Sequence, residues 1–279
     1  MPTAPYVLEH NAAEIARLIA YAGREAEEVR MVCRRAALGI GGSAVDIGCG
    51  PLGAMTTLAE IVGESGEIVG LDSSAEALAK AASLLEHLGV GNVRLMQVDL
   101  NTADVDELKL RDRFDLAYAR LVLLHQRDPA AFLKRMIQLV RPGGYIAYQD
   151  IVDDLAYPAC EPAVPAQTRA WKLILGLFAL RSLTPGVARD HSVLARSTGC
   201  ELVHQRGKFA VLPASDGLAI VQQLMAASRN HLSEVGLANH AETDALIAEI
   251  ESAKAGSYRY WHGPLAIETI IRKPSAAAV

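Results

Sequence analysis

Apolar residues recur along most of the chain with two different spacings, which predict strands and helices in alternation. Short apolar runs bounded by glycine or polar residues predict buried strands, and stretches with apolar positions three and four apart predict helices between them. This repeated order is typical of a mostly parallel sheet with helices on both faces. The expected strands are 44–47, 67–71, 93–98, 114–119 and 145–149, and the expected helices between them are 52–62, 74–88 and 129–140.

The pattern changes at both ends of the chain. Residues 9–38 predict helices, because Ile15, Leu18, Ile19 and Ala22 recur at helical spacing. Beyond residue 150 the sequence predicts apolar helices at 168–183, 187–198, 217–237 and 242–255, with strands at 201–212 and 265–271. We therefore expect an N-terminal helical cap (1–42), a strand–helix core (43–151), and lid insertions with two last strands that complete the same domain (152–279).

Composition and charge narrow the class of protein. The 279 residues are 51% hydrophobic, which is enough for one large core with a lid. The net charge is -5 and no basic run is present, which argues against a nucleic-acid partner. The most apolar segment, Leu173 to Leu180, is far shorter than the roughly 20 residues that cross a bilayer, so we expect no membrane partner. The apolar helix at 168–183 can serve an oligomer interface as well as a lid.

The spacing of the cysteines indicates the cellular compartment of the protein. Cys33, Cys49, Cys160 and Cys200 are scattered, and no C-x-x-C pair occurs. This spacing favours reduced thiols over a disulfide framework or a zinc site. We therefore predict a cytoplasmic protein.

The stretch Val45–Gly53 predicts where a ligand binds. An apolar run leads into Gly48, Gly50 and Gly53, and Asp46 lies two positions before the first glycine. Glycine allows positive φ and a close approach of the backbone to a ligand. A strand that turns through glycines into a helix also directs backbone N–H groups at a partly negative molecule. The same three glycines match the G-x-G-x-x-G pattern of dinucleotide-binding proteins, so the stretch predicts a cofactor without deciding which one.

Polar residues follow the other strands at the edge where ligands bind in open α/β sheets. Asp72 follows the second strand, 19 residues after Gly53, where a carboxylate can accept hydrogen bonds from both hydroxyls of a ribose. Asp99 and Leu100 follow the third strand and offer an acceptor for an exocyclic amine beside an apolar shelf for an aromatic base. Arg120 and Asp150 end the fourth and fifth strands.

Taken together and in this order, the glycine stretch, Asp72, the Asp99–Leu100 pair and the Arg-Pro-Gly-Gly turn at 141–144 resemble class I S-adenosylmethionine-dependent methyltransferases. The resemblance implies a Rossmann-like, seven-stranded sheet that is mostly parallel with an antiparallel last strand, plus a helical lid. It implies S-adenosyl-L-methionine as cofactor, with S-adenosyl-L-homocysteine as product. The cofactor-binding residues that it implies are Tyr6, Asp46, Gly48, Cys49, Gly50, Asp72, Ser73, Asp99, Leu100 and Arg120.

The resemblance assigns parts of the cofactor to some of these residues. The loop with Gly48 and Gly50 contacts the methionine part, Asp72 the ribose and Asp99 the adenine amine. Two roles stay open. Tyr6 either closes over the sulfonium or packs the N-terminal helix, and Arg120 either binds the cofactor carboxylate or pairs with Asp46 or Asp150.

Two other classes explain part of the pattern. A nicotinamide-dependent dehydrogenase explains the glycines and Asp72, but neither Asp46 nor the turn at 141–144. The Tyr-x-x-x-Lys pair of short-chain dehydrogenases is also absent, because no tyrosine has a lysine four residues on. A non-catalytic cofactor-binding protein is the third alternative.

The residues after the fourth strand narrow the range of possible methyl acceptors. Ala119–Val122 lacks the Asn/Asp-Pro-Pro-Tyr/Phe turn of enzymes that methylate bases or planar amides, and Arg120 stands where metal-dependent enzymes need an acidic ligand. We therefore predict no metal. The stretches 120–129 and 261–264 resemble the small-molecule, natural-product branch of the family, in which a lid covers the substrate. An apolar lid indicates a hydrophobic or aromatic metabolite as substrate.

The chemistry sets what a catalytic residue has to do. The methyl group of a sulfonium is already activated, so much of the rate can come from positioning. A hydroxyl acceptor is helped by a general base. His125 is the first candidate, and a structural role at a helix start is the alternative. The substrate-contact candidates on the lid are Trp171, His191, His231 and Trp261. We predict O-methylation, with C- or N-methylation as the alternative.

Overall fold

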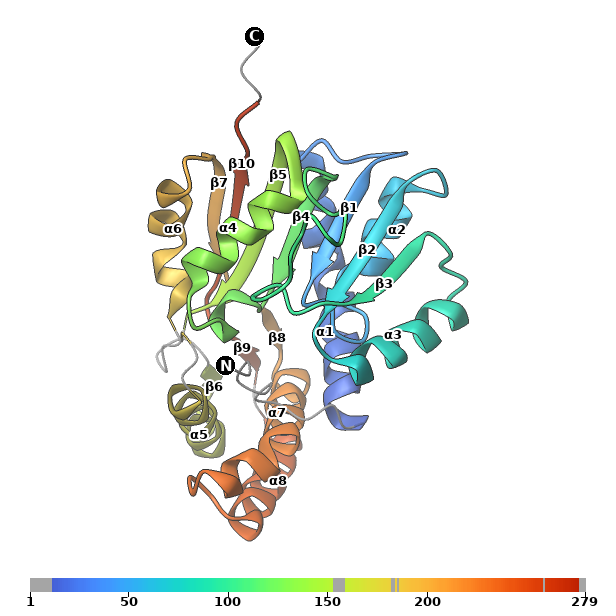
Figure 1. Cartoon of the computed structure of the whole chain (residues 1–279). Coiled ribbons are helices and arrows are strands. Elements are labelled where there is room, and N and C mark those ends of the chain that lie inside the picture. Colours follow the sequence, from blue (N-terminus) through green and yellow to red (C-terminus); the bar gives the residue numbers. More distant parts are fainter. Residues whose placement is uncertain (1–11, 153–158, 182–183, 185, 258, 276–279) are drawn as a thin grey trace.

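The computed structural model describes residues 12–152, 159–181, 184, 186–257 and 259–275. A twisted seven-stranded sheet runs through its centre (Figure 1). Pairing is parallel except around β10, which is antiparallel to both of its neighbours, as the sequence predicted. In spatial order the strands are β3 (Val93–Gln97), β2 (Glu67–Asp72), β1 (Ser43–Ile47), β4 (Phe114–Arg120), β5 (Val140–Ile151), β10 (Ala266–Arg272) and β7 (Glu201–Lys208).

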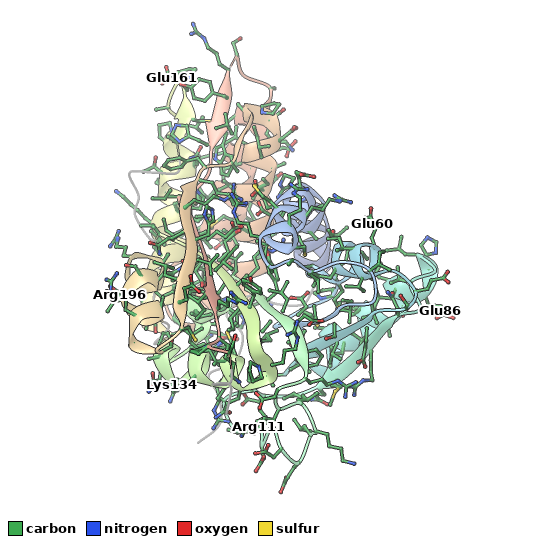
Figure 2. All side chains as sticks on the ribbon, turned by 90° about the horizontal axis from the view of Figure 1, so that it is seen from above. Glu60, Glu86, Arg111, Lys134, Glu161 and Arg196 are labelled. Atoms are coloured by element: carbon green, nitrogen blue, oxygen red, sulfur yellow. The ribbon has the colours of Figure 1, made fainter. Side chains whose placement is uncertain are left out.

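Helices cover both faces of this sheet. One face carries α1 (Ala12–Arg35), α2 (Met55–Val62) and α3 (Ala75–His87), and the other carries α4 (Pro129–Leu139) and α6 (His191–Ser197). Figure 2 shows this division, with Glu60 of α2 and Lys134 of α4 directed outward on opposite sides. The sequence encodes the helix starts, because the Ser74 hydroxyl accepts a hydrogen bond from Ala77 N and the Asp128 carboxylate accepts one from Ala131 N.

The remaining elements form a lid beyond the carboxyl ends of the parallel strands (Figure 1). It consists of α5 (Pro165–Leu180), α7 (Ala214–Glu234) and α8 (His240–Lys254), which pack on one another, and a small sheet of β6 (Ala159–Glu161), β9 (Tyr260–His262) and β8 (Val211–Pro213). Gly217 lets α7 approach this sheet, because a Cβ there would lie 2.2 Å from the Trp261 ring. The sequence did not predict the small sheet, since strands of three residues are too short to show a period.

Two expectations about local structure are corrected. The helix expected in the lid at 187–198 is a 3-10 turn, η2 (Val187–Asp190), followed by α6, which packs on β7, β10 and α4. Its buried His191 and Ala195 hold it against the sheet. The expected turn at 141–144 is instead the first part of β5, where Gly143 has φ +80° and donates to Lys273 O.

The helices within the described ranges are too short or too polar to cross a membrane.

Candidate functional site

A cavity of about 930 Å³ lies between the carboxyl ends of the strands, α1 and the lid. It is at the upper end of the range of roughly 300–1,000 Å³ that small-molecule sites occupy, which leaves room for two ligands side by side. Its lining changes along the sheet. Acidic and glycine residues of β1, β2 and β3 line one half, and apolar residues of the lid line the half over β5, β10 and β7.

The glycine stretch forms the floor of the polar half. Gly48, Gly50 and Gly53 have φ values of +63°, +55° and +53°, which glycine adopts without strain. A Cβ on Gly50 would meet no atom within 4 Å, so this turn leaves open space over the backbone. A Cβ on Gly53 would lie 2.3 Å from Asp46 Oδ2. The loop is therefore tight on the side of the sheet and open on the side of the cavity, as close binding of a ligand requires.

Asp46 is buried beneath this loop and holds its end. Its Oδ2 accepts a hydrogen bond from Ala54 N at 2.7 Å, at the start of α2. Burial raises the pKa of Asp46 to about 7, against the opposing effects of the Ala54 N–H and the Arg120 charge. Arg120 in turn donates from Nη2 to Gly53 O at 3.2 Å. The sequence left Asp46 and Asp150 open as partners of Arg120. In the structure Arg120 lies on the side of Asp46, whereas Asp150 faces His191.

Asp72 and Asp99 lie at the ends of neighbouring strands, as the sequence predicted. Asp72 accepts hydrogen bonds from Gly50 N and Ser74 N, both at 2.8 Å, and so ties the glycine loop to the start of α3. Asp99 Oδ1 accepts from the backbone N and from Nδ2 of Asn101, both at 3.0 Å. Ten of the residues expected to bind the cofactor or to act in catalysis line the cavity: Asp46, Gly48, Cys49, Gly50, Asp72, Ser73, Asp99, Leu100, Arg120 and His125. Tyr6 lies outside the described residues.

His125 lies on η1 (Leu123–His125), a 3-10 turn that lies against β5. Leu121 starts this turn with φ +57°, a strained value for a residue with a side chain, and its N–H donates to Gln149 O at 2.7 Å. Asp150 Oδ1 accepts from Leu124 N at 3.1 Å. The His125 ring lies edge-on to Phe178 of α5, with centroids 6.2 Å apart. His125 therefore faces the boundary between the two halves of the cavity.

The apolar half contains both tryptophans expected there. Trp171 of α5 and Trp261 of β9 line the cavity, and they are 6% and 2% exposed. Their contact with a substrate stays a prediction. Further apolar side chains of this half come from α5, α7, the segment from the end of β7 to β8, and the residues between β9 and β10; they include Phe178, Phe209, Leu212, Ile220, Leu224 and Pro264.

Two histidines expected to contact substrate lie elsewhere. The residues that line the cavity, within the described part of the chain, do not include His191 or His231. His191 is fully buried on the sheet, with Nε2 at 3.3 Å from Asp150 Oδ2 and Nδ1 at 3.2 Å from Thr269 Oγ1. His231 of α7 contacts Arg181 and Glu234 at the outer side of the lid. Helical periodicity alone did not show which face of each helix would turn to the sheet.

Sequence reasoning missed several charged residues of the cavity wall, and two of them, Glu25 and Lys208, form an ion pair. Glu25 lies on the buried stripe of α1 with Ala22, Val29 and Val32, and Lys208 is the last residue of β7. A signal for Glu25 exists, because a carboxylate interrupts an apolar stripe spaced three and four residues apart. No such signal exists for Lys208, because its partner is 183 residues away.

The described residues contain no group of three or more His, Cys, Asp and Glu side chains that could hold a metal ion. The prediction that the reaction needs no metal stays a prediction.

Comparisons with known proteins agree with this fold. The family model described as "Methyltransferase domain" matches residues 40–188, more than half of the chain. An uncharacterised 37.1 kDa protein in transposon Tn4556 of Streptomyces fradiae is 38% identical over 105 residues, 37% of this chain and 28% of that protein. A demethylmenaquinone methyltransferase of Bacillus cereus is 36% identical over 107 residues, 38% of this chain and 43% of that enzyme.

The chain thus spans less than half the length of these curated relatives. Among solved structures, a proposed methyltransferase of Bacillus halodurans shares the fold with a TM-score of 0.59 at 16% identity, over 90% of this chain and 100% of that one.

Proposed function

Because the chain belongs to the class I S-adenosylmethionine-dependent methyltransferases, we propose that it methylates a small hydrophobic or aromatic metabolite held beneath its lid. The observation that carries this proposal is the division of one cavity into two unlike halves. Acidic strand ends and a glycine loop suit a nucleoside with an amino-acid tail, and the apolar half beside them suits an acceptor without charge of its own.

The residues of the polar half fit the cofactor. The open space over Gly50 admits a ligand close to the backbone, and Asp72 and Asp99 place carboxylates at the two strand ends where ribose and adenine would bind. Each carboxylate oxygen can accept more than one hydrogen bond, so both residues can bind ligand while they hold their loops. When bound, S-adenosylmethionine supplies an electrophilic methyl group, and the chain has to orient the acceptor and exclude water around it.

We propose oxygen as the accepting atom, with carbon or nitrogen as the alternative. Oxygen is favoured because charged side chains lie at the margin of the apolar half and can assist the loss of a hydroxyl proton. A nicotinamide-dependent oxidoreductase stays the remote alternative that the glycine loop and Asp72 leave open.

Calorimetric titration with S-adenosylmethionine and with NAD tests this function. We expect S-adenosylmethionine to bind with a dissociation constant between about 1 µM and 1 mM, and NAD not to bind measurably. Transfer of a labelled methyl group to hydroxylated aromatic compounds then tests turnover. Binding of NAD without binding of S-adenosylmethionine would refute the proposal, and cofactor binding without turnover on any acceptor would indicate a non-catalytic protein.

The affinity for S-adenosylmethionine should increase as the pH rises through 7. Asp46 has a pKa of about 7, so it is mostly neutral at pH 6 and mostly ionised at pH 8. An ionised carboxylate attracts the positive charges of the ligand, which in turn lower the pKa of Asp46 by about one to two pH units. We expect affinity to rise about five- to tenfold between pH 6 and pH 8 in calorimetric titrations.

The control for this pH dependence is Asp46→Asn. Its side-chain oxygen can still accept from Ala54 N, but the residue does not titrate. Any pH dependence that remains belongs to the ligand or to other ionisable groups of the cavity. An Asn variant as pH-dependent as the wild type would show that Asp46 does not ionise in this range.

A further inference from the structure

An ion pair between α1 and β7 forms part of the cavity wall. Lys208 Nζ donates to Glu25 Oε2 at 2.5 Å and lies 3.7 Å from Glu28 Oε2. Gln149 of β5 also donates to Glu25 Oε2, at 3.4 Å. The side chains of Glu25 and Lys208 are 11% and 17% exposed, and both line the cavity. The pair is thus largely shielded from bulk water but open to a ligand.

Lys208 lies in the apolar half of the cavity, and Glu25 lies at the boundary with the polar half. Lys208 ends the edge strand β7, four strands from β1, which corresponds to about 19 Å at ~4.8 Å a strand. Its pairing partner Ala266 also pairs with Ile151, and Phe209–Leu212 follow it in the apolar wall. Glu25 extends over β5, because it accepts a hydrogen bond from Gln149 of that strand, and Gln149 pairs with Arg120 of β4. The Glu25 carboxylate therefore lies between the apolar half and the polar half of the cavity.

Attachment of α1 to the sheet does not depend on this pair. Arg206 of β7 pairs with both Glu28 of α1 and Glu268 of β10. Val29 and Val32 of α1 are also buried in the core. A largely buried ion pair has a desolvation cost, and ionisable groups of this kind are concentrated at functional sites. The place of the Glu25–Lys208 pair in the cavity wall thus indicates a chemical role.

We propose that Glu25 and Lys208 are the acid–base pair of the acceptor site, and that the acceptor is a phenol or a similar aromatic compound with an ionisable hydroxyl. This inference rests on the proposed function. The Lys208 ammonium has three N–H donors, so it can donate to the acceptor oxygen while it holds Glu25. The Glu25 carboxylate can accept several hydrogen bonds, so it can take the hydroxyl proton while it holds Lys208.

The step balances without another reactant. The acceptor O–H bond breaks and its proton goes to Glu25, while the acceptor oxygen forms a bond to the methyl carbon. The carbon–sulfur bond breaks, and its electron pair stays on the sulfur, which loses its positive charge. Glu25 then returns the proton to water. Lys208 stabilises the negative charge that develops on the acceptor oxygen. General base catalysis of this kind contributes about 10²–10⁴-fold.

Other charged groups surround the pair and contribute to its pH dependence. They are Arg24 and Glu28 on α1, Arg120 on β4, Arg206 on β7 and Glu268 on β10, with His125 on the η1 turn beyond the strand end. These groups are present both in the wild type and in a variant that removes one member of the pair. A change of pH profile in such a variant therefore reports the loss of that member, together with its effect on close neighbours such as Glu28, which lies 3.7 Å from Lys208 Nζ.

The first test measures the ionisation of a bound phenol. The probe is 4-nitrophenol, which absorbs visible light as its phenolate, added to the protein saturated with S-adenosylhomocysteine. We expect the wild type to lower the apparent pKa of the bound phenol by about one to three pH units, because an ammonium lies beside it. Lys208→Met should abolish this effect. The affinity for 4-nitroanisole, which has no hydroxyl, should stay unchanged in Lys208→Met.

The second test measures methyl transfer from S-adenosylmethionine to 4-methylphenol as a function of pH, because this less acidic phenol keeps its hydroxyl proton at neutral pH and needs a base to remove it. Glu25→Gln should lower kcat about a hundredfold or more and change the dependence of the rate on pH, because the group proposed to accept the hydroxyl proton is lost. The matched controls are Lys254→Met and Glu251→Gln, which remove the two members of an exposed ion pair of 2.8 Å on α8. Both controls should behave as the wild type.

The outcomes separate this inference from the proposed function. Unchanged affinity for S-adenosylhomocysteine shows that a variant folds and that its cofactor site is intact. The inference is overturned if the wild type binds no phenolate, if Lys208→Met stabilises the phenolate as well as the wild type, or if Glu25→Gln keeps the full rate and pH profile. It is also overturned if the variants lose affinity only for the cofactor, because the pair then belongs to the cofactor site. Failure of the wild type to bind S-adenosylmethionine or S-adenosylhomocysteine would instead refute the proposed function.

Discussion

Asp72→Ala should weaken the binding of S-adenosylmethionine about a hundredfold or more. The carboxylate accepts hydrogen bonds from Gly50 N and Ser74 N, so its removal releases the glycine loop from the start of α3. It also removes the acceptor that the family places on the cofactor ribose. A hydrogen bond to a charged group is worth about 1.5–3 kcal/mol, and loss of two such bonds corresponds to at least a hundredfold in affinity. Calorimetric titration of the purified variant measures this loss.

Two matched variants show where the effect originates. Asp72→Asn keeps an oxygen acceptor of the same shape without the charge, and we expect it to lose only about tenfold in affinity. Asp104→Ala removes an exposed carboxylate that also accepts from backbone N–H groups, at Asp106 and Glu107, but lies outside the cavity lining. It should bind as the wild type does. If Asp72→Ala binds S-adenosylmethionine as tightly as Asp104→Ala, Asp72 takes no part in the cofactor site.

The polar half of the cavity could be predicted from the sequence because its residues lie at the ends of strands or just beyond them. A parallel sheet brings successive carboxyl ends to one edge, so Asp46, Asp72 and Asp99 had to come together once the strands were recognised. The glycine loop needed no distant contact to be identified, since its positive φ values are a local property. Local order along the chain thus predicted the fold and brought together the residues that we expect to bind the cofactor.

The apolar half of the cavity was harder to predict from the sequence, because its geometry depends on contacts between distant segments of the chain. Glu25 and Lys208 are 183 residues apart and meet only when α1 crosses the sheet next to its edge strand. The helix with His191 is apolar enough for a lid, yet its histidine is paired with Asp150 inside the sheet layer. Periodicity shows that a helix has a buried face but not which partner buries it.

Gly53→Ala should disrupt the glycine loop and the fold around it more than any other glycine-to-alanine change at comparable φ outside the loop. The added Cβ would lie 2.3 Å from Asp46 Oδ2 and 2.6 Å from Cys49 O, and neither atom belongs to the free end of a flexible side chain. The residue would also hold φ near +53°, which costs a side-chain-bearing residue about 1–2 kcal/mol. The loop then has to move and break the bond from Ala54 N to Asp46, which leaves a buried carboxyl without its donor.

We expect these effects to lower the free energy of unfolding by about 3–5 kcal/mol, as the strain and the lost hydrogen bond add. Urea unfolding measures the stability, and calorimetry should show at least a hundredfold loss of affinity for S-adenosylmethionine. Gly236→Ala is the matched control, because Gly236 has φ +73° and a Cβ there meets no atom within 4 Å. It should cost only about 1–2 kcal/mol from backbone strain and leave cofactor affinity unchanged. Equal stability of the two variants would show that the loop yields to a methyl group, and that its tight packing on Asp46 does not hold it in shape.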